Sequence, residues 1–137
     1  MDWSKVKIMY DVISAILEVH RQLGVGLFEK SYKFALLHEL RLRGYKAEEE
    51  QAIDIRYKGE VIKEAYQADI IVDDMLIIEL KATEKLNKYH HAQLQNYMLL
   101  SGKPYGVLVN FHEMDILKGG ISRKSLLEIE ERCYAEN

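Results

Sequence analysis

The stretch ADIIVDDMLIIELKATEK, residues 68–85, reads as two apolar strands around an acidic turn, and three charged residues lie within the strands themselves. They are Asp69, Glu79 and Lys81. A carboxylate inside a sheet core is unfavourable unless a partner charge or a metal ion compensates for its lost hydration. Two carboxylates on adjacent strands form an oxygen site suited to Mg²⁺ or Mn²⁺. A lysine two residues from one of them can neutralise a phosphate or hold an attacking water.

The connection between the two predicted strands decides whether these side chains meet. Side chains alternate along a strand, so Glu79 and Lys81 share a face. A two-residue turn at 73–74 would place Asp69 on the opposite face, so convergence requires an odd-length loop or a bulge. We therefore predict that the turn is not a plain two-residue hairpin. The spacing alone fits a solvated salt bridge of Glu79 with Lys81 or Lys85 equally well.

Two flanking segments add candidate site residues. Glu29 in GLFE occupies the first turn of a predicted helix and shares its inward face with the apolar positions that follow. Gln93 and Tyr97 lie one turn apart on another predicted helix. Each also has an ordinary explanation, because first-turn carboxylates favour the helix dipole and amphipathic helices have polar edges.

The elements that position these residues follow from hydrophobic periodicity, which is helical in some segments and alternating in others. We expect an N-terminal helix (4–23, capped by Ser4), a second helix (27–43), three antiparallel strands (52–81), a helix (86–101), a strand (105–111), a turn followed by an edge strand (119–123) and a weakly helical tail (124–137). The order α-α-β-β-β-α-β predicts an α/β (α+β) domain in which helices flank a central mixed sheet. The 137 residues form one domain with its core at about 20–123.

Composition limits the class of protein. The only cysteine, Cys133, excludes an internal disulfide and any four-cysteine cluster, and we expect a cytoplasmic protein. No apolar run is long enough to cross a membrane, so we expect no membrane partner. The net charge of −3 argues mildly against a phosphate-binding surface, although a bound divalent cation would change the local sign. Basic residues do crowd the second helix and its exit, where a solvated face explains most of them: Lys30, Lys33, Arg41, Arg43 and Lys46.

Together these motifs resemble a known superfamily. Asp69 followed by E-x-K at Glu79 and Lys81 resembles the core of the PD-(D/E)XK nucleases, and GLFE and Q-x-x-x-Y resemble flanking motifs of RecB-type exonucleases. Over most of its length the chain is similar to the bacterial GxxExxxY proteins, with the naming motif GLFEKSY at 26–32. One departure is Tyr66, which stands where the RecB-type pattern has glycine and could crowd the path of a DNA backbone.

The resemblance implies a restriction-endonuclease-like fold and a Mg²⁺ (or Mn²⁺) site. The implied metal ligands are Asp69, Glu79, the Leu80 carbonyl and Glu29, and the implied catalytic residues are Lys81, Glu79, Asp69, Gln93 and Tyr97. In this scheme Lys81 orients or helps to deprotonate the attacking water. Gln93 and Tyr97 position the lysine or a DNA phosphate.

The resulting hypothesis is a metal-dependent nuclease that hydrolyses DNA phosphodiester bonds. An alternative is a catalytically silent nuclease-fold protein that binds nucleic acid or another protein, and a small-molecule phosphodiesterase is a third candidate. Because the chain has no room for a separate target-recognition domain, we also expect a homodimer or a protein partner.

Overall fold

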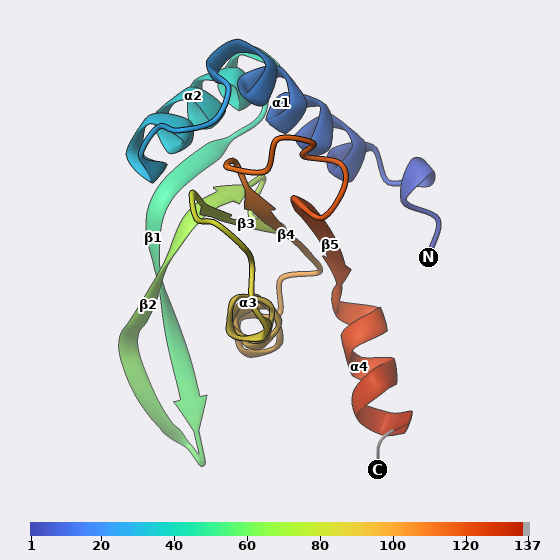
Figure 1. Cartoon of the computed structure of the whole chain (residues 1–137). Helices are drawn as coiled ribbons and strands as arrows, with labels where there is room; N and C mark the ends of the chain where they lie inside the picture. The colour runs from blue at the N-terminus through green and yellow to red at the C-terminus, as the bar shows by residue number, and fades with distance from the viewer. Residues whose placement is uncertain (136–137) are drawn as a thin grey trace.

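A five-stranded sheet of order β1-β2-β3-β4-β5 forms the centre of the molecule in a computed structural model that describes residues 1–135, with side chains to Glu131 (Figure 1). The elements are η1 (Trp3–Lys5), α1 (Lys7–Leu23), α2 (Glu29–Leu42), β1 (Ala47–Tyr57), β2 (Glu60–Val72), β3 (Leu76–Lys81), α3 (Lys88–Ser101), β4 (Tyr105–Asn110), β5 (Ile121–Ser125) and α4 (Leu126–Ala135). Among the helices of residues 1–135, none is long and apolar enough to cross a membrane.

The sheet is mixed, as predicted. The first three strands form an antiparallel meander, and α3 then connects β3 to the parallel strand β4. β5 is antiparallel to β4 and completes the second edge. A helix between two parallel neighbours is the usual connection because a tight turn cannot join strands that run in the same direction. This crossover brings α3 against one face of the sheet, where it contacts β4, β1 and β3.

Helices pack on both faces of the sheet. The pair α1 and α2 lies on one face, and α3 lies on the other beside α4 (Figure 1). Each face has its own apolar cluster, which for β3 means that Ile78 and Leu80 pack with α1 and α2 while Ile77 packs with α3. The central strands are therefore apolar on both sides, and a charge placed there must be explained.

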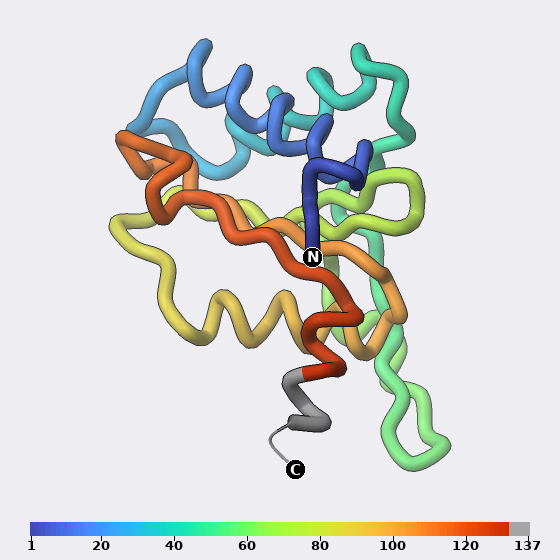
Figure 2. Tube along the Cα trace, turned by 90° about the vertical axis from the view of Figure 1, so that its right-hand side faces the viewer, coloured from blue at the N-terminus to red at the C-terminus, as the bar shows by residue number. Residues whose placement is uncertain are grey.

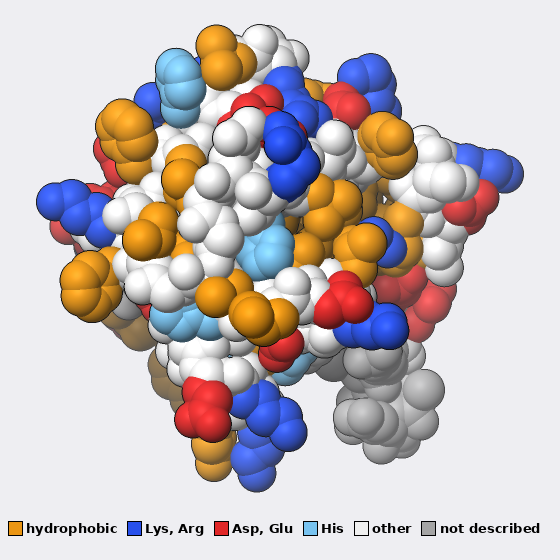
Figure 3. All heavy atoms as spheres, turned by 45° about the horizontal axis from the view of Figure 1, so that its top comes forward, with side chains coloured by type: hydrophobic (Ala, Val, Ile, Leu, Met, Phe, Trp, Pro, Cys, Tyr) orange, Lys and Arg blue, Asp and Glu red, His pale blue; other side chains and the backbone are white. Residues whose placement is uncertain are grey.

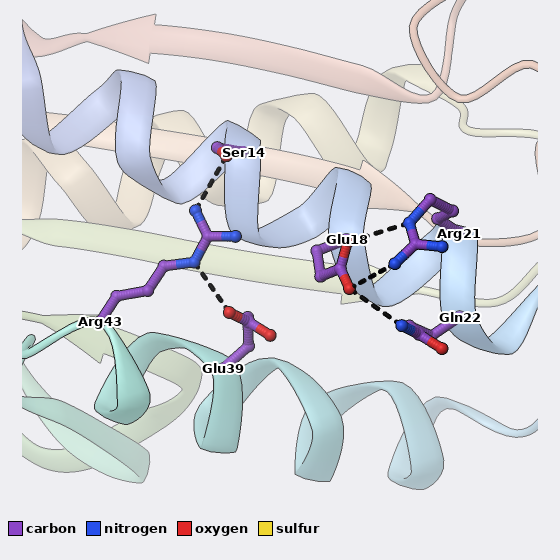
Figure 4. Close-up of polar contacts among 6 residues, drawn as sticks. All are labelled: Ser14, Glu18, Arg21, Gln22, Glu39 and Arg43. Atoms are coloured by element: carbon purple, nitrogen blue, oxygen red, sulfur yellow. Dashed lines mark hydrogen bonds and ion pairs between the residues drawn. The ribbon is translucent and has the colours of Figure 1, made fainter.

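Side-chain contacts join the two helices of the first layer (Figure 4). The Arg43 guanidinium donates to the hydroxyl of Ser14 on α1 at 2.8 Å and to the carboxylate of Glu39 on α2 at 2.8 Å. On α1, Glu18 accepts two hydrogen bonds from Arg21. Arg43 thus links the end of α2 to the middle of α1 and helps to fix the α2 axis.

The β2–β3 connection confirms the prediction about the turn. It contains three residues, because Ile70 pairs with Ile78 and Val72 with Leu76. Asp73 and Asp74 adopt positive φ angles of 49° and 58°, a conformation that aspartate tolerates better than most side chains. Directly opposed residues share a face of the sheet, and in regular register this three-residue connection sets Asp69 opposite Glu79 rather than Ile78.

Several predicted boundaries were wrong. β1 begins at Ala47 and includes the glutamates at 48–50, which were expected to precede the strands. Their side chains are compatible with a strand because β1 is at the edge of the sheet and only Ala47 needs to be buried there. Ser4 does not cap the first helix, since α1 begins at Lys7 after a 3₁₀ turn that Asp2 caps.

At the C-terminal end, the turn and edge strand predicted for residues 119–123 are both present: Gly119 has a φ of 87° in the turn, and β5 begins at Ile121. The segment predicted as a weakly helical tail contributes the end of β5 and then α4, and residues 136 and 137 lie outside the described part of the chain.

Strands β1 and β2 continue past the rest of the sheet as a two-stranded arm (Figures 1 and 2). The arm ends in the predicted turn, where Lys58 and Gly59 both have positive φ angles, as a type I′ hairpin requires. The register shifts between Ile53 and Ile55, which marks a bulge at the base of the arm. Only the body of the sheet therefore contributes to the layered core.

Candidate active site

Glu79 is a buried acid, and one of its oxygens has no hydrogen-bond partner among the described residues. It lies on β3 among apolar neighbours, its exposed fraction is 9%, and its Oε1 atom is buried and unsatisfied. Burial, reinforced by the nearby Asp69 carboxylate, raises the pKa of Glu79 to about 8. Without a cation the pair therefore tends to hold a proton at neutral pH, and a bound cation would favour the ionised form.

Asp69 lies at the point where β2 and β3 separate. The ladder of paired residues between these strands runs from Val72 to Ile70, one residue short of Asp69. Side-chain alternation also breaks there, because Ala68 packs in the α3-side cluster and Ile70 in the opposite one. The Oδ2 atom of Asp69 accepts a hydrogen bond from the Leu80 N–H at 3.0 Å. This bond fixes the aspartate beside the residue that follows Glu79.

A cavity of about 450 Å³ opens between α2 and the ends of β1, β2 and β3. Its lining consists of Glu29, Lys30, Lys33, Phe34, Glu49, Glu50, Asp69 and Leu80. Asp69, Glu29 and the residue Leu80, three of the four positions predicted to supply metal ligands, therefore border one space. Glu79, the fourth, is not part of the lining.

The loop before α2 directs Glu29 towards the end of β3. The buried hydroxyl of Tyr32 donates to the Gly24 carbonyl at 2.7 Å and accepts from the Leu27 N–H at 3.1 Å, so one side chain closes the loop. The Oε1 atom of Glu29 then lies 3.4 Å from the Ala82 N–H, from which it accepts a hydrogen bond. The exposed Glu29 carboxylate is thus held at the mouth of the cavity rather than within it.

Lys81 ends β3 on the same face as Glu79. Its side chain is half-buried and makes no ion pair with any residue in the described part of the chain. Its charge acts on Glu79 in the direction opposite to burial, which favours the ionised carboxylate. The backbone is fixed at this point because the Lys81 carbonyl accepts from the Phe111 N–H at 2.9 Å. An available ammonium therefore lies next to the carboxylate pair.

Asn110 holds the backbone after Lys81 and was not among the predicted site residues. Its fully buried amide donates to the Thr83 carbonyl at 2.9 Å and accepts from the Thr83 N–H at 3.1 Å and the His112 N–H at 3.2 Å. It therefore links the loop after β3 to the loop after β4. The sequence does contain an indication of this role, because Asn110 is a polar residue at the end of the apolar strand VLVNF, and a buried amide needs hydrogen-bond partners.

The two predicted α3 residues behave differently. Tyr97 stacks on Tyr66 with an interplanar angle of 12°, and burial raises the pKa of both hydroxyls, with the charge of Glu79 acting in the same direction. The Tyr66 hydroxyl is buried without a hydrogen-bond partner in the described part of the chain. Gln93 is exposed and forms no side-chain hydrogen bond with residues 1–131. Tyr66 and Tyr97 thus form one stacked pair near enough to Glu79 to be influenced by its charge, while Gln93 is free to contact a ligand.

The donor set fits a small oxygen-binding cation, although the side chains are not gathered around one point. Within the described residues, no three His, Cys, Asp or Glu side chains are placed to hold a metal ion. Mg²⁺ needs only one or two protein carboxylates because it keeps several waters. Asp69 and Glu79 provide these, and the unsatisfied Oε1 atom of Glu79 is the observation that favours a ligand role.

A comparison with protein families bears on this geometry. A family model described as the PD-(D/E)XK nuclease superfamily matches residues 6–124. The chain belongs to this superfamily. No curated protein and no solved structure matches the chain.

Membership of the PD-(D/E)XK superfamily accounts for the general arrangement of the site. The matched segment runs from α1 to β5 and includes both carboxylates and Lys81. The mixed five-stranded sheet with flanking helices is consistent with this superfamily, whose members are generally nucleases that use divalent metals. The superfamily therefore indicates a nuclease-like function and nucleic acid as the ligand.

Proposed function

We propose that the protein is a metal-dependent nuclease that hydrolyses DNA phosphodiester bonds. The buried, unsatisfied carboxylate of Glu79 beside Asp69 is the observation that supports this proposal most directly. Such an arrangement is unfavourable for stability alone and is expected where a cation compensates for it. We assign Mg²⁺ or Mn²⁺ to Asp69, Glu79 and the Leu80 carbonyl, with Glu29 as a further ligand at the cavity mouth.

The chain's own groups have separate roles in the proposed reaction. A divalent ion bound at the site would polarise the scissile phosphate and lower the pKa of a bound water. Lys81 donates a hydrogen bond to the attacking water or to a phosphate oxygen, which its half-buried and otherwise unpaired ammonium allows. Gln93 is exposed and can position a phosphate. Tyr97 acts through its stack on Tyr66, which closes the α3 side of the site to water.

Within the superfamily, we also propose that the protein is a member of the GxxExxxY proteins. The support is that the residues of GLFEKSY form one local structural unit. Gly26 adopts a φ of 98°, Tyr32 closes the loop through its hydroxyl, and Glu29 is thereby directed towards Ala82. We also propose that Glu29 and Tyr97 act as RecB-like flanking residues, which is supported by the position of their helices, α2 and α3, on opposite faces of the sheet (Figure 1).

Purified protein with Mg²⁺ or Mn²⁺ should degrade or nick DNA. Glu79→Ala and Lys81→Ala should each abolish cleavage without unfolding the protein, whereas Lys85→Ala, which alters an exposed lysine nearby, should not. The products are resolved by gel electrophoresis, and circular dichroism confirms the fold of each variant. Undiminished cleavage by both site variants would refute the assignment.

A catalytically silent nuclease-fold protein is the second candidate. Two observations favour it: no three metal-binding side chains converge within the described residues, and Tyr66, stacked on Tyr97, brings a large, partly buried side chain into the neighbourhood of the carboxylates. Calorimetric titration with Mn²⁺ separates the candidates, because a nuclease must bind the ion through Asp69 and Glu79. Absence of Mn²⁺ binding, together with retained nucleic-acid or protein binding, would support the silent module.

We also propose that the protein acts as a homodimer or with a protein partner, because nuclease domains of this size commonly need a second subunit to grip a duplex. Sedimentation of the protein alone and with a DNA duplex measures the stoichiometry, and a purely 1:1 complex would exclude the homodimer.

A further inference from the structure

Helix α2 exposes an aromatic ring beside the carboxylates. Phe34 is 76% exposed, yet it lines the same cavity as Asp69 and Leu80. A single exposed apolar residue needs no explanation in general. An aromatic ring at the rim of a cavity with catalytic carboxylates is different, because aromatic rings at such positions provide stacking surfaces for nucleic-acid bases.

A lysine one turn earlier on α2 lies on the same rim. Lys30 precedes Phe34 by four residues, so the two side chains are neighbours on one face of the helix. Lys30 forms no ion pair with any residue of the described segment, whereas Lys33 is bound to Glu50 at 2.7 Å. The ammonium of Lys30 is therefore free to contact a phosphate. The face that carries α1 and α2 shows exposed hydrophobic and basic side chains intermixed (Figure 3).

The charges around the cavity determine which side an anionic strand can approach. The lining carries more carboxylates than ammonium groups, and Glu49 and Glu50 belong to the β1 side. A divalent cation at the carboxylate pair would reverse much of this field. The remaining favourable approach for a phosphate is along α2, past Lys30.

We propose that Phe34 and Lys30 bind one nucleotide of a single-stranded nucleic acid, with the ring stacked on an unpaired base and the ammonium on its phosphate. The inference rests on the proposed function, because it places this nucleotide next to the bond to be cut. Single strands are specified because the faces of a base are covered by its neighbours inside a duplex. The substrate class is thus single-stranded nucleic acid or the frayed end of a duplex.

An apolar protein segment is the competing occupant of this surface. Phe34 also borders a groove of about 820 Å³ between α1 and α2, where Leu23 and Leu27 are partly exposed. That groove would suit a hydrophobic helix. Phe34 and Lys30 line the same cavity as Asp69, and this favours the nucleotide over the hydrophobic helix.

The test is fluorescence anisotropy with a labelled oligothymidine and a labelled duplex of equal length, in Ca²⁺ so that binding is measured without cleavage. Phe34→Ala should weaken single-strand binding roughly 5- to 100-fold and leave duplex binding little changed, and Phe34→Trp should restore it. Lys30→Gln should weaken both and reduce the slope of log K against log salt by about 0.7 for the single strand. Tyr10→Ala is the control, because Tyr10 is 67% exposed on α1 and does not line this cavity.

Three results would overturn the inference: no single-strand binding by the wild-type protein, unchanged affinity in Phe34→Ala, or equal losses for single strand and duplex. If Phe34→Ala instead abolishes self-association in sedimentation while oligonucleotide affinity is unchanged, the surface is a protein-docking site. Failure of the proposed function is seen separately. It appears as cleavage that survives Glu79→Ala, a result that leaves the anisotropy outcome for Phe34 unaffected.

Discussion

Replacing the buried acid Glu79 with glutamine should make the metal-free protein more stable at alkaline pH. In the folded chain, burial and the Asp69 charge raise the pKa of Glu79 from 4.5 to about 8. Between these pH values the folded state binds a proton that the unfolded state releases. The favourable contribution of this proton is complete below about pH 4.5 and is lost as the pH rises through about 8.

The size of the effect follows from the same two pKa values. The free energy of unfolding should fall by up to about 1.4 kcal/mol for each pH unit in this window. Over the whole window the unfolding free energy should fall by at most about 4 kcal/mol. This is less than the full slope would give across the window, because solvent penetration and proton sharing with Asp69 reduce the cost of ionising Glu79. Glu79→Gln is nearly isosteric and cannot ionise, so it should lack this slope.

Urea denaturation of both proteins in EDTA, at pH values from 5 to 8.5, measures the difference directly. Other groups that titrate in this range, such as the histidines, contribute equally to both proteins and cancel. Mn²⁺ should restore the stability of the wild-type protein at high pH but not that of the variant. If the difference in unfolding free energy between the two proteins is the same at every pH, Glu79 is not the strained acid that the geometry indicates.

Three further substitutions test the neighbourhood of the site by thermal or urea denaturation. Tyr66→Phe removes a buried hydroxyl without a partner and should stabilise the protein by about 1 kcal/mol, so a loss of stability would reveal an overlooked bond. Asn110→Ala removes the hydrogen-bond partner of both backbone groups of Thr83, so we expect the free energy of unfolding to fall by about 2–4 kcal/mol and cleavage to slow. A variant with unchanged stability would show that water replaces the amide. Gly106→Ala should cost about 1–3 kcal/mol because the new methyl carbon would lie 2.5 Å from the Met98 sulfur, and an unchanged midpoint would mean that α3 can shift without penalty.

The sequence predicted the features that depend on the regular spacing of apolar residues or on whether a loop has an odd or even number of residues. The apolar positions of α1 and α2 predicted two helices, and the alternation through β2 and β3 predicted strands. The requirement that Asp69 and Glu79 meet predicted a turn longer than two residues, and the three-residue connection confirms it. These arguments succeed because they depend only on which face of an element a side chain occupies.

Features that depend on tertiary partners were missed. The glutamates at 48–50 do not look like a strand, because β1 derives its stability from pairing with β2 and leaves one edge to solvent. The contacts of Asn110 join segments that are far apart in sequence, so no local pattern specifies them. The stack of Tyr97 on Tyr66 likewise depends on how α3 packs against β2, which periodicity does not determine.

The three-residue connection between β2 and β3 restricts which insertions and deletions this loop can accept. Ile70 and Ile78 are paired and face the same apolar layer, so deleting one residue from the loop would oppose side chains that belong to different layers. Neither strand could rotate to compensate, since both are apolar on two sides. Insertions and deletions at this loop should therefore be tolerated only in multiples of two residues. A library of loop-length variants, scored for soluble expression, should show this even–odd dependence.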